Sequence, residues 1–166
     1  MEIELNKETK INQIDFKNLS FGETFSDHMF ICEYLDGEWI DPKITPYKPI
    51  LLDPSVSALH YGQSVFEGMK AYKDNNGKVW LFRPKENWER LNKSCKRMKI
   101  PEVPEEYFIN GLKKLISIDS SWVQPGHGNS LYIRPFVFAS QATVQASPSN
   151  EYKFIIICSP AKSYYN

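Results

Sequence analysis

The stretch Leu59–Leu91, LHYGQSVFEGMKAYKDNNGKVWLFRPKENWERL, carries the pattern on which the fold prediction depends. Its middle part is a run of strand-forming residues on both sides of Asn76-Gly77, a dipeptide typical of a two-residue hairpin turn. From Lys85 onward the apolar residues recur at helical spacing. The stretch therefore predicts a β-hairpin that is followed directly by an amphipathic helix.

Two helices are predicted in the middle of the chain. The first covers KENWERLNKSCKRM (85–98), and its apolar stripe consists of Trp88, Leu91, Cys95 and Met98. The second lies within PEEYFINGLKKLISIDSSW (104–122), and its stripe consists of Phe108, Leu112, Leu115 and Ile116. Each stripe covers one side of its helix, so each helix is expected to bury that side and expose the other.

The remaining apolar segments predict strands. HMFICEYLDGEWID (28–41) indicates another hairpin, earlier in the chain, that turns at Asp36-Gly37, and PYKPILLDP (46–54) indicates a short strand bounded by prolines. SLYIRPFVFAS (130–140) and EYKFIIICSP (151–160) have nearly continuous apolar runs, which favour central strands buried on both faces. Several strands with two helices grouped between them predict an α+β fold, an antiparallel sheet with both helices packed against one side.

Length and the two ends suggest a division of the chain. The 166 residues suit one domain, and we expect a loose polar arm over residues 1–20 and a small domain over residues 21–166. The last residues, SPAKSYYN, follow directly on a predicted buried strand. A chain that stops there is expected to continue into a second domain.

Composition argues against several classes of protein. Lys plus Arg and Asp plus Glu both number 20, so the positive charge of a nucleic-acid or acidic-membrane binder is missing. The N-terminus is too charged for a signal peptide, and the best apolar run, FIIIC, is far too short to span a membrane. The three cysteines and three histidines are scattered, so neither disulfides nor a metal site are expected. We expect a cytoplasmic protein.

Lys70 raises the first question about a site. With a turn at Asn76-Gly77, Lys70 falls opposite Arg83, and like charges opposed on a sheet repel each other. Either both side chains extend into water, or an anion or Glu67 lies between them.

Arg90 also allows two interpretations. It lies early in the first predicted helix, where the helix dipole disfavours a cation. Helix N-terminal amides and a guanidinium can together bind a phosphate. Alternatively, Arg90 is solvated and pairs with Glu86.

Arg134 interrupts an otherwise apolar central strand, and a buried guanidinium requires a partner. Three nearby aromatics, Tyr61, Phe66 and Tyr132, fit core packing on pattern alone.

Four segments in this order resemble the branched-chain amino acid aminotransferases, which are fold-type-IV pyridoxal-phosphate enzymes. The segments are FGETFSDHMF (21–30), LHYGQSVFEGMKAY (59–72), LFRPKENWERLNKS (81–94) and SLYIRPFVFAS (130–140). The likeness runs from about Phe21 to Tyr164 and implies the small N-terminal α+β domain of a two-domain, homodimeric enzyme. In this family the cofactor-binding lysine lies in the second domain. The resemblance therefore implies that neither Lys70 nor Lys73 is that amine, and that this chain holds no catalytic residue.

The resemblance also assigns binding residues. Arg90 matches the arginine that holds the cofactor phosphate. The positions implied to contact substrate are Phe21, Tyr61, Phe66, Tyr132, Arg134 and Tyr164. Tyr61 is implied to reach the neighbouring subunit's site. After LYIRP the chain reads SQATVQASPS (140–149) and lacks the glycine-containing loop of the family, which leaves the contacts of residues 144–146 open.

The function implied is amino-group transfer between leucine, isoleucine or valine and 2-oxoglutarate through pyridoxal 5'-phosphate. The chain alone is expected to be inactive, because it lacks the lysine segment. Two alternatives share the fold, a D-amino acid transaminase and an aminodeoxychorismate lyase, and the LYIRP segment argues against both. A third alternative is a non-catalytic binding or dimerisation module. A reading frame that continues into a GNYK-like lysine segment would distinguish enzyme from module. The preferred amino acid, the direction of flux and the oligomer size are left open.

Overall fold

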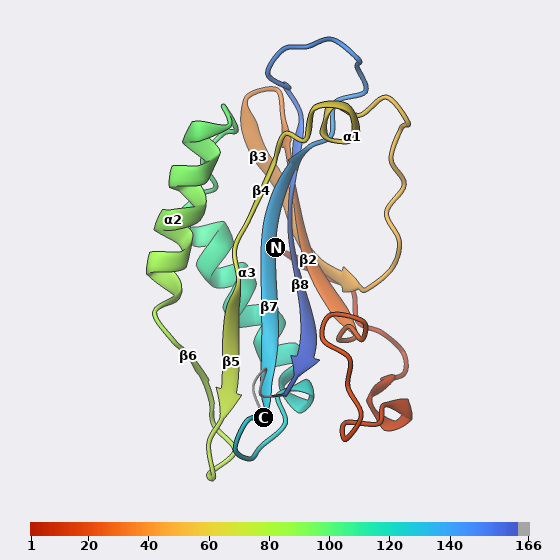
Figure 1. Ribbon diagram of the computed structural model, residues 1–166, viewed down its shortest axis with the longest axis vertical. Coiled ribbons are helices and arrows are strands. Elements are labelled where there is room, and N and C mark those ends of the chain that lie inside the picture. The colour runs from red at the N-terminus through yellow and green to blue at the C-terminus, as the bar shows by residue number, and fades with distance from the viewer. Residues whose placement is uncertain (163–166) are drawn as a thin grey trace.

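The computed structural model describes residues 1–162 of the chain (Figure 1). Over these residues the chain forms one eight-stranded sheet, and helices α2 (Pro84–Arg97) and α3 (Glu105–Ile118) cover one of its faces. A third helix, α1 (Ser57–Tyr61), is short and lies at one end of the sheet. The predicted α+β class, with two helices against one side of a sheet, is confirmed.

The sheet is antiparallel except at one edge. Its strand order is β1 (Glu2–Ile3), β3 (Glu38–Pro46), β2 (His28–Leu35), β8 (Tyr152–Ala161), β7 (Ser130–Ala139), β5 (Met69–Lys73) and β6 (Val79–Leu81). Strand β4 (Ser64–Phe66) lies off this path and pairs with β7. Among the strands of the described residues, only β1 and β3 pair in parallel. The strands predicted at 130–140 and 151–160 are therefore central, as expected, and they pair with each other.

The hairpin predicted over residues 28–41, the first along the chain, is confirmed. Leu35 pairs with Glu38, which leaves Asp36 and Gly37 as a two-residue turn. Both have positive φ, 51° and 88°, as a type I′ turn requires. Strand β2 of this hairpin pairs with β3 on one side and with β8 on the other.

The second predicted hairpin forms with a register that differs from the prediction by one residue. Tyr72 pairs with Trp80, and the Asp74 N–H donates to the Lys78 carbonyl, so the loop contains three residues, 75–77. Asp74 Oδ1 accepts the backbone N–H groups of Asn76 and Lys78, which stabilises this wider turn. The predicted opposition of Lys70 and Arg83 is therefore wrong, because a shift of one residue changes every cross-strand partner.

The strand predicted within residues 46–54 is also wrong. Strand β3 ends at Pro46, and residues 47–56 form no strand or helix. Proline lacks the amide donor that a sheet ladder needs, and this segment contains Pro49 and Pro54. Leu51 is 97% exposed, whereas Ile50 and Leu52 pack against a small apolar cluster on the sheet.

The main core lies between the sheet and the two helices. Leu91 and Cys95 of α2 are fully buried, and so is the predicted stripe of α3. Met98, expected to continue the α2 stripe, is 37% exposed where that helix ends. The strands contribute the other half of the core, with buried residues such as Ile133 and Phe154.

The opposite face of the sheet, which we call the open face, carries the other side chains of the central strands. On β7, Tyr132, Arg134 and Phe136 alternate with buried residues and are only partly buried. The expected two-sided burial thus holds for β8, where most residues are buried, but not for the first part of β7.

The N-terminal segment is tied to the sheet rather than loose. The Asp27 carboxylate accepts hydrogen bonds from the Thr9 hydroxyl, the Lys10 N–H and the Trp122 indole N–H. The Asn6 N–H donates to Nε2 of His28, whose Nδ1 lies 2.6 Å from Asp119 Oδ1. These contacts hold residues 6–10 against the start of β2, while the division into an arm and a domain stays a prediction.

Candidate functional site

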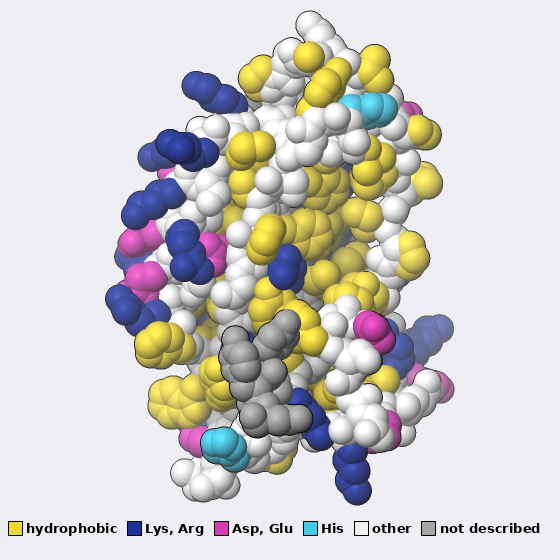
Figure 2. Space-filling view, in the orientation of Figure 1, with side chains coloured by type: hydrophobic (Ala, Val, Ile, Leu, Met, Phe, Trp, Pro, Cys, Tyr) yellow, Lys and Arg dark blue, Asp and Glu magenta, His cyan; other side chains and the backbone are white. Residues whose placement is uncertain are grey.

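The open face is where the predicted site residues gather. In Figure 2 apolar side chains collect over the middle of the sheet, while charged side chains crowd the side on which α2 lies. Phe66 on β4, Lys70 on β5, and Tyr132 and Arg134 on β7 come from three adjacent strands. Strand pairing therefore brings together residues that lie up to 68 positions apart in the sequence.

An apolar pocket of about 200 Å³ lies on this face over β7 and β8. Phe21 packs edge-on against Tyr132, with their ring centres 5.0 Å apart. The lining residues are Phe21, Gly22, Phe25, Tyr132, Arg134, Ile157, Cys158 and Ser159. Two predicted substrate residues of one strand and a third from the N-terminal segment thus form one cavity.

Arg134 is held by neutral groups. Its Nε and Nη2 donate to the Tyr132 hydroxyl oxygen at 3.1 and 2.7 Å, and its guanidinium lies 4.2 Å from the centre of the Phe66 ring. No acidic side chain pairs with Arg134 within residues 1–162. The partners of the Arg134 guanidinium are therefore a phenol and an aromatic face, and no described residue compensates its positive charge.

Gly68 is required by the position of Tyr132. A Cβ at Gly68 would lie 2.6 Å from the Tyr132 hydroxyl oxygen, closer than non-bonded atoms approach. Any side chain there would push the phenol away from Arg134. The glycine of the FEG segment therefore positions the Tyr132–Arg134 pair.

Glu67, which follows β4, and Arg90 of α2 form a bidentate ion pair. Arg90 Nε and Nη2 donate to the two Glu67 carboxylate oxygens at 2.7 and 2.8 Å, and Asn87 donates to the same carboxylate at 2.9 Å. Burial by itself raises the pKa of the Glu67 carboxyl, but these hydrogen bonds outweigh it and lower the pKa below its ordinary value. The pairing of Arg90 with Glu86 is wrong, since Glu86 pairs with Arg83 at 2.7 Å.

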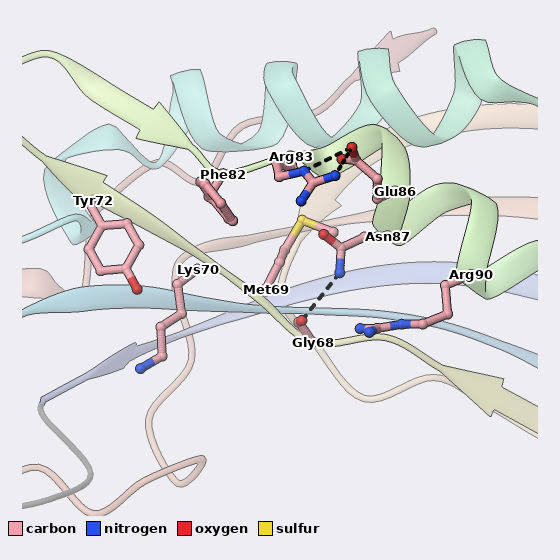
Figure 3. A pocket seen from close by; sticks show the side chains of 9 residues that line it. All are labelled: Gly68, Met69, Lys70, Tyr72, Phe82, Arg83, Glu86, Asn87 and Arg90. Carbon is pink, nitrogen blue, oxygen red and sulfur yellow. Dashed lines mark hydrogen bonds and ion pairs between the residues drawn. The ribbon is translucent and has the colours of Figure 1, made fainter.

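A second pocket, of about 360 Å³, lies between β5 and the first half of α2 (Figure 3). Its lining residues are Gly68, Met69, Lys70, Tyr72, Phe82, Arg83, Glu86, Asn87 and Arg90. The Arg90 side chain reaches this pocket from the helix and remains 67% exposed. A guanidinium that is fixed by Glu67 and still accessible can bind an anion.

Comparison with known proteins then settles the family. The family described as Amino-transferase class IV matches residues 64–165, which include the FEG, Arg90 and LYIRP positions. The chain belongs to this family. The class IV aminotransferase chain is 48% identical over 158 residues to branched-chain-amino-acid aminotransferase 2 of Bacillus subtilis, and 50% identical over 152 residues to a probable branched-chain-amino-acid aminotransferase of Staphylococcus epidermidis. These matches cover 95% and 91% of the chain but only 44% and 42% of the relatives, so the chain spans less than half of their length.

Solved structures of the same group share the fold. The branched-chain aminotransferase of Escherichia coli superposes with a TM-score of 0.63 at 25% identity, over 84% of this chain and 41% of that one. A T.th. branched-chain aminotransferase complexed with N-(5'-phosphopyridoxyl)-L-glutamate gives a TM-score of 0.54 at 27% identity, over 76% of this chain and 39% of that one. The resemblance to this group is confirmed.

Two further predicted residues of the aminotransferase chain lie on its surface. Tyr61 in α1 is 50% exposed and Phe66 is 61% exposed, so neither is the core aromatic that the pattern suggested. The Tyr61 hydroxyl donates to the Val144 carbonyl. This contact places the loop 140–149, whose sequence departs from the family pattern, next to α1. Tyr164 lies outside the described residues.

Sequence reasoning missed Gln63 and did not name Phe25 or Ser159 as pocket residues. Gln63 is buried, and its side chain donates to the Met98 carbonyl and accepts the Ser149 N–H, so it joins α2 to the loop 140–149. The only sequence signal for Gln63 is its position between Tyr61 and Phe66, two residues implied to contact substrate.

Three further observations concern metal ligands, membrane spans and thiols in the described part of the chain. No group of three or more His, Cys, Asp or Glu there could hold a metal ion, and no helix there is long and apolar enough to cross a membrane. Burial raises the pKa of the Cys32 and Cys95 thiols to about 12, so neither is ionised near neutral pH.

Proposed function

We propose that this chain is the N-terminal part of a branched-chain amino acid aminotransferase. The complete enzyme transfers an amino group between leucine, isoleucine or valine and 2-oxoglutarate. Family membership and the names of the relatives support the reaction class. The observation that carries the proposal is the pocket on the open face, where apolar walls surround one guanidinium that no residue among 1–162 neutralises.

Such a pocket suits two unlike substrates. An aliphatic substrate side chain in this pocket would contact the rings of Phe21 and Tyr132 and the side chain of Ile157. A distal carboxylate would be costly to bury against these walls alone, but Arg134 presents a planar fork that can bind it. With an aliphatic substrate Arg134 keeps its bonds to Tyr132 and its contact with Phe66.

The cofactor that we assign is pyridoxal 5'-phosphate, and the residues present fit its phosphate. Arg90 uses Nε and Nη2 on Glu67, which leaves Nη1 and most of the side chain available to a phosphate oxygen. When bound, the cofactor supplies the electron sink for the reaction. The part of this chain is to bind and orient it through Arg90, while Glu67 and Asn87 hold that arginine in place.

We further propose a homodimer in the cytoplasm, with Tyr61 contributing to the neighbouring subunit's site. Four large apolar side chains around α1 support a contact surface there, because each is at least half exposed. They are Leu59, Tyr61, Phe66 and Val144. A dimer measured by sedimentation, and lost when Leu59 and Val144 are both replaced by Asp, is the expected result.

The direct test joins residues 1–166 to the C-terminal part of the Bacillus subtilis relative. The chimera should transfer the amino group of leucine, isoleucine and valine to 2-oxoglutarate, and the chain alone should not. Turnover of D-alanine or aminodeoxychorismate instead would favour the other enzymes of this fold. A folded chimera without any turnover, beside an active parent relative, would favour a non-catalytic module.

A further inference from the structure

Ser159 on β8 carries a buried hydroxyl without a hydrogen-bond partner. The residue is 2% exposed, and its Oγ bonds to no donor or acceptor among the described residues. Burial of an unpaired hydroxyl is unfavourable, and most buried polar side chains are paired. Ser149, a buried serine just before β8, follows that rule, because its hydroxyl donates to the Glu151 carbonyl at 2.8 Å. The Ser159 hydroxyl therefore requires an explanation.

Strand pairing places this hydroxyl on the open face. Ser159 lies directly opposite Tyr132, so the two side chains project from the same face of the sheet. The same face of β8 carries Ile155 and Ile157, whereas Cys158 belongs to the main core beneath the helices. At the end of this row, where the preceding residues are apolar, the chain has a serine.

The unpaired hydroxyl lines the same pocket as Arg134. Both residues belong to the lining of the cavity of about 200 Å³ over β7 and β8. Ser57, the other buried serine of the described range with an unpaired hydroxyl, begins helix α1 and does not belong to this lining. The pocket thus combines a hydroxyl that can donate with a guanidinium that no described residue neutralises.

One kind of ligand group satisfies both. A carboxylate has two acceptor oxygens and a negative charge, so it can accept from a hydroxyl and from a guanidinium at the same time. An aliphatic side chain offers no acceptor, and with such a ligand the Ser159 hydroxyl stays unpaired. The two polar residues therefore favour a ligand with a carboxylate inside an otherwise apolar pocket.

We propose that Ser159 is a specificity-determining residue, and that its Oγ–H donates to the distal carboxylate of the acidic substrate beside Arg134. The inference deepens the proposed function and rests on it, because it assigns the acidic substrate to this pocket. A site that is built to hydrogen-bond one substrate discriminates against a substrate that lacks the matching group. Ser159 thus shifts the preference of the pocket from leucine toward glutamate.

The first experiment compares Ser159→Ala with Ser149→Ala in the chimera. Ser159→Ala should lower the ratio of kcat/KM for glutamate to kcat/KM for leucine about tenfold, the order of one hydrogen bond to a charged group. Its Tm should not fall, because the folded protein loses no hydrogen bond. Ser149→Ala is the matched control outside the pocket lining. It removes a paired hydroxyl, so it should lower the Tm and leave the ratio unchanged.

The second experiment measures binding without turnover. Glutarate carries a distal carboxylate and 4-methylvalerate ends in an aliphatic group, and each is titrated into the chimera and its Ser159→Ala variant by calorimetry. The variant should bind glutarate about tenfold more weakly, with a change of less than twofold for 4-methylvalerate. Equal weakening of both probes, or an unchanged affinity for glutarate, overturns the proposal, and the hydroxyl then meets only water in this pocket.

The two experiments separate this inference from the proposed function. A folded chimera that turns over no substrate, but loses glutarate affinity in Ser159→Ala, refutes the aminotransferase alone. An active chimera whose substrate ratio and glutarate affinity do not change in Ser159→Ala refutes the Ser159 role alone. A folded chimera that neither binds glutarate nor turns over substrate refutes both.

Discussion

At the scale of single residues, the site depends on Glu67 and Gly68, which follow each other in the chain. The Glu67 carboxylate is 4% exposed and fixes Arg90 from α2, while Gly68 leaves room for the Tyr132 hydroxyl. Glu67 thus orients Arg90, the residue proposed to bind the cofactor phosphate. Gly68 leaves Tyr132 in place to hold Arg134, the residue proposed to bind the substrate carboxylate. The short segment between β4 and β5 connects the two halves of the site.

The first prediction at this scale concerns the pH dependence of stability. The pKa of Glu67 is lowered in the folded protein, so its ion pair stabilises the fold above the ordinary carboxyl pKa of about 4.3 and loses this effect as pH falls through the folded value. Urea unfolding at pH 7 and near pH 3 should show a smaller acid-induced loss for Glu67→Gln than for the unchanged chain. Equal acid-induced losses for Glu67→Gln and the unchanged chain would contradict this role of Glu67.

The same ion pair predicts the effect of removing its cation. Arg90→Leu should lower the Tm at pH 7 by roughly 5 °C, because it leaves a buried carboxylate without its partner.

The second prediction concerns Gly68. Gly68→Ala should destabilise the chain by about 1–3 kcal/mol, because the new methyl group collides with the Tyr132 hydroxyl. Tyr132→Phe removes that oxygen, so the double variant should lose less than the sum of the two single losses. The measurement is a double-mutant cycle by chemical denaturation. Strict additivity would mean that Tyr132 is not what requires a glycine.

At the scale of elements, the sequence predicts what local patterns encode. Helices α2 and α3 and both hairpins follow from spacing and turn residues, and each is present. The register of the second hairpin does not follow, because the Asp74 carboxylate stabilises a three-residue loop where Asn76-Gly77 alone indicates two. Glu86, the alternative partner considered for Arg90, lies one helical turn away, whereas the actual partner Glu67 is 23 residues away. Contacts between residues so far apart in the sequence depend on sheet topology. The site residues can therefore be predicted from the family resemblance, but not from the spacing of apolar residues.

The prediction at this scale concerns the N-terminal segment. Burial raises the pKa of the Asp27 carboxyl, but hydrogen bonds from Lys10, Thr9 and Trp122 lower it below its ordinary value. Asp27→Asn should therefore release residues 6–10 and destabilise the chain by about 1–3 kcal/mol. Hydrogen exchange should accelerate at the Lys10 amide and the Trp122 indole while the centre of β8 stays protected. Unchanged exchange at both groups would show that the segment is held by other contacts.

At the scale of the whole molecule, the two faces of the sheet differ in kind. Helices α2 and α3 complete the core on one face, while the open face keeps apolar side chains exposed around α1 and the pocket. Exposed apolar patches of this extent drive association. Light scattering of the isolated chain should therefore show a mass that rises with concentration. A single monomeric mass at high concentration would mean that this face needs no partner.

The central claim is that one pocket accepts both an aliphatic and an acidic substrate because Arg134 serves only the acidic one. The most direct measurement is kcat/KM for leucine and for glutamate in the chimera and in its Arg134→Gln variant. The account predicts a loss for glutamate that corresponds to ~2–5 kcal/mol of lost stabilisation, with leucine far less affected. Arg134→Lys, which keeps the charge, should recover part of the glutamate activity. Equal losses for both substrates, together with a lower Tm, would show that Arg134 only braces the sheet and would contradict the account.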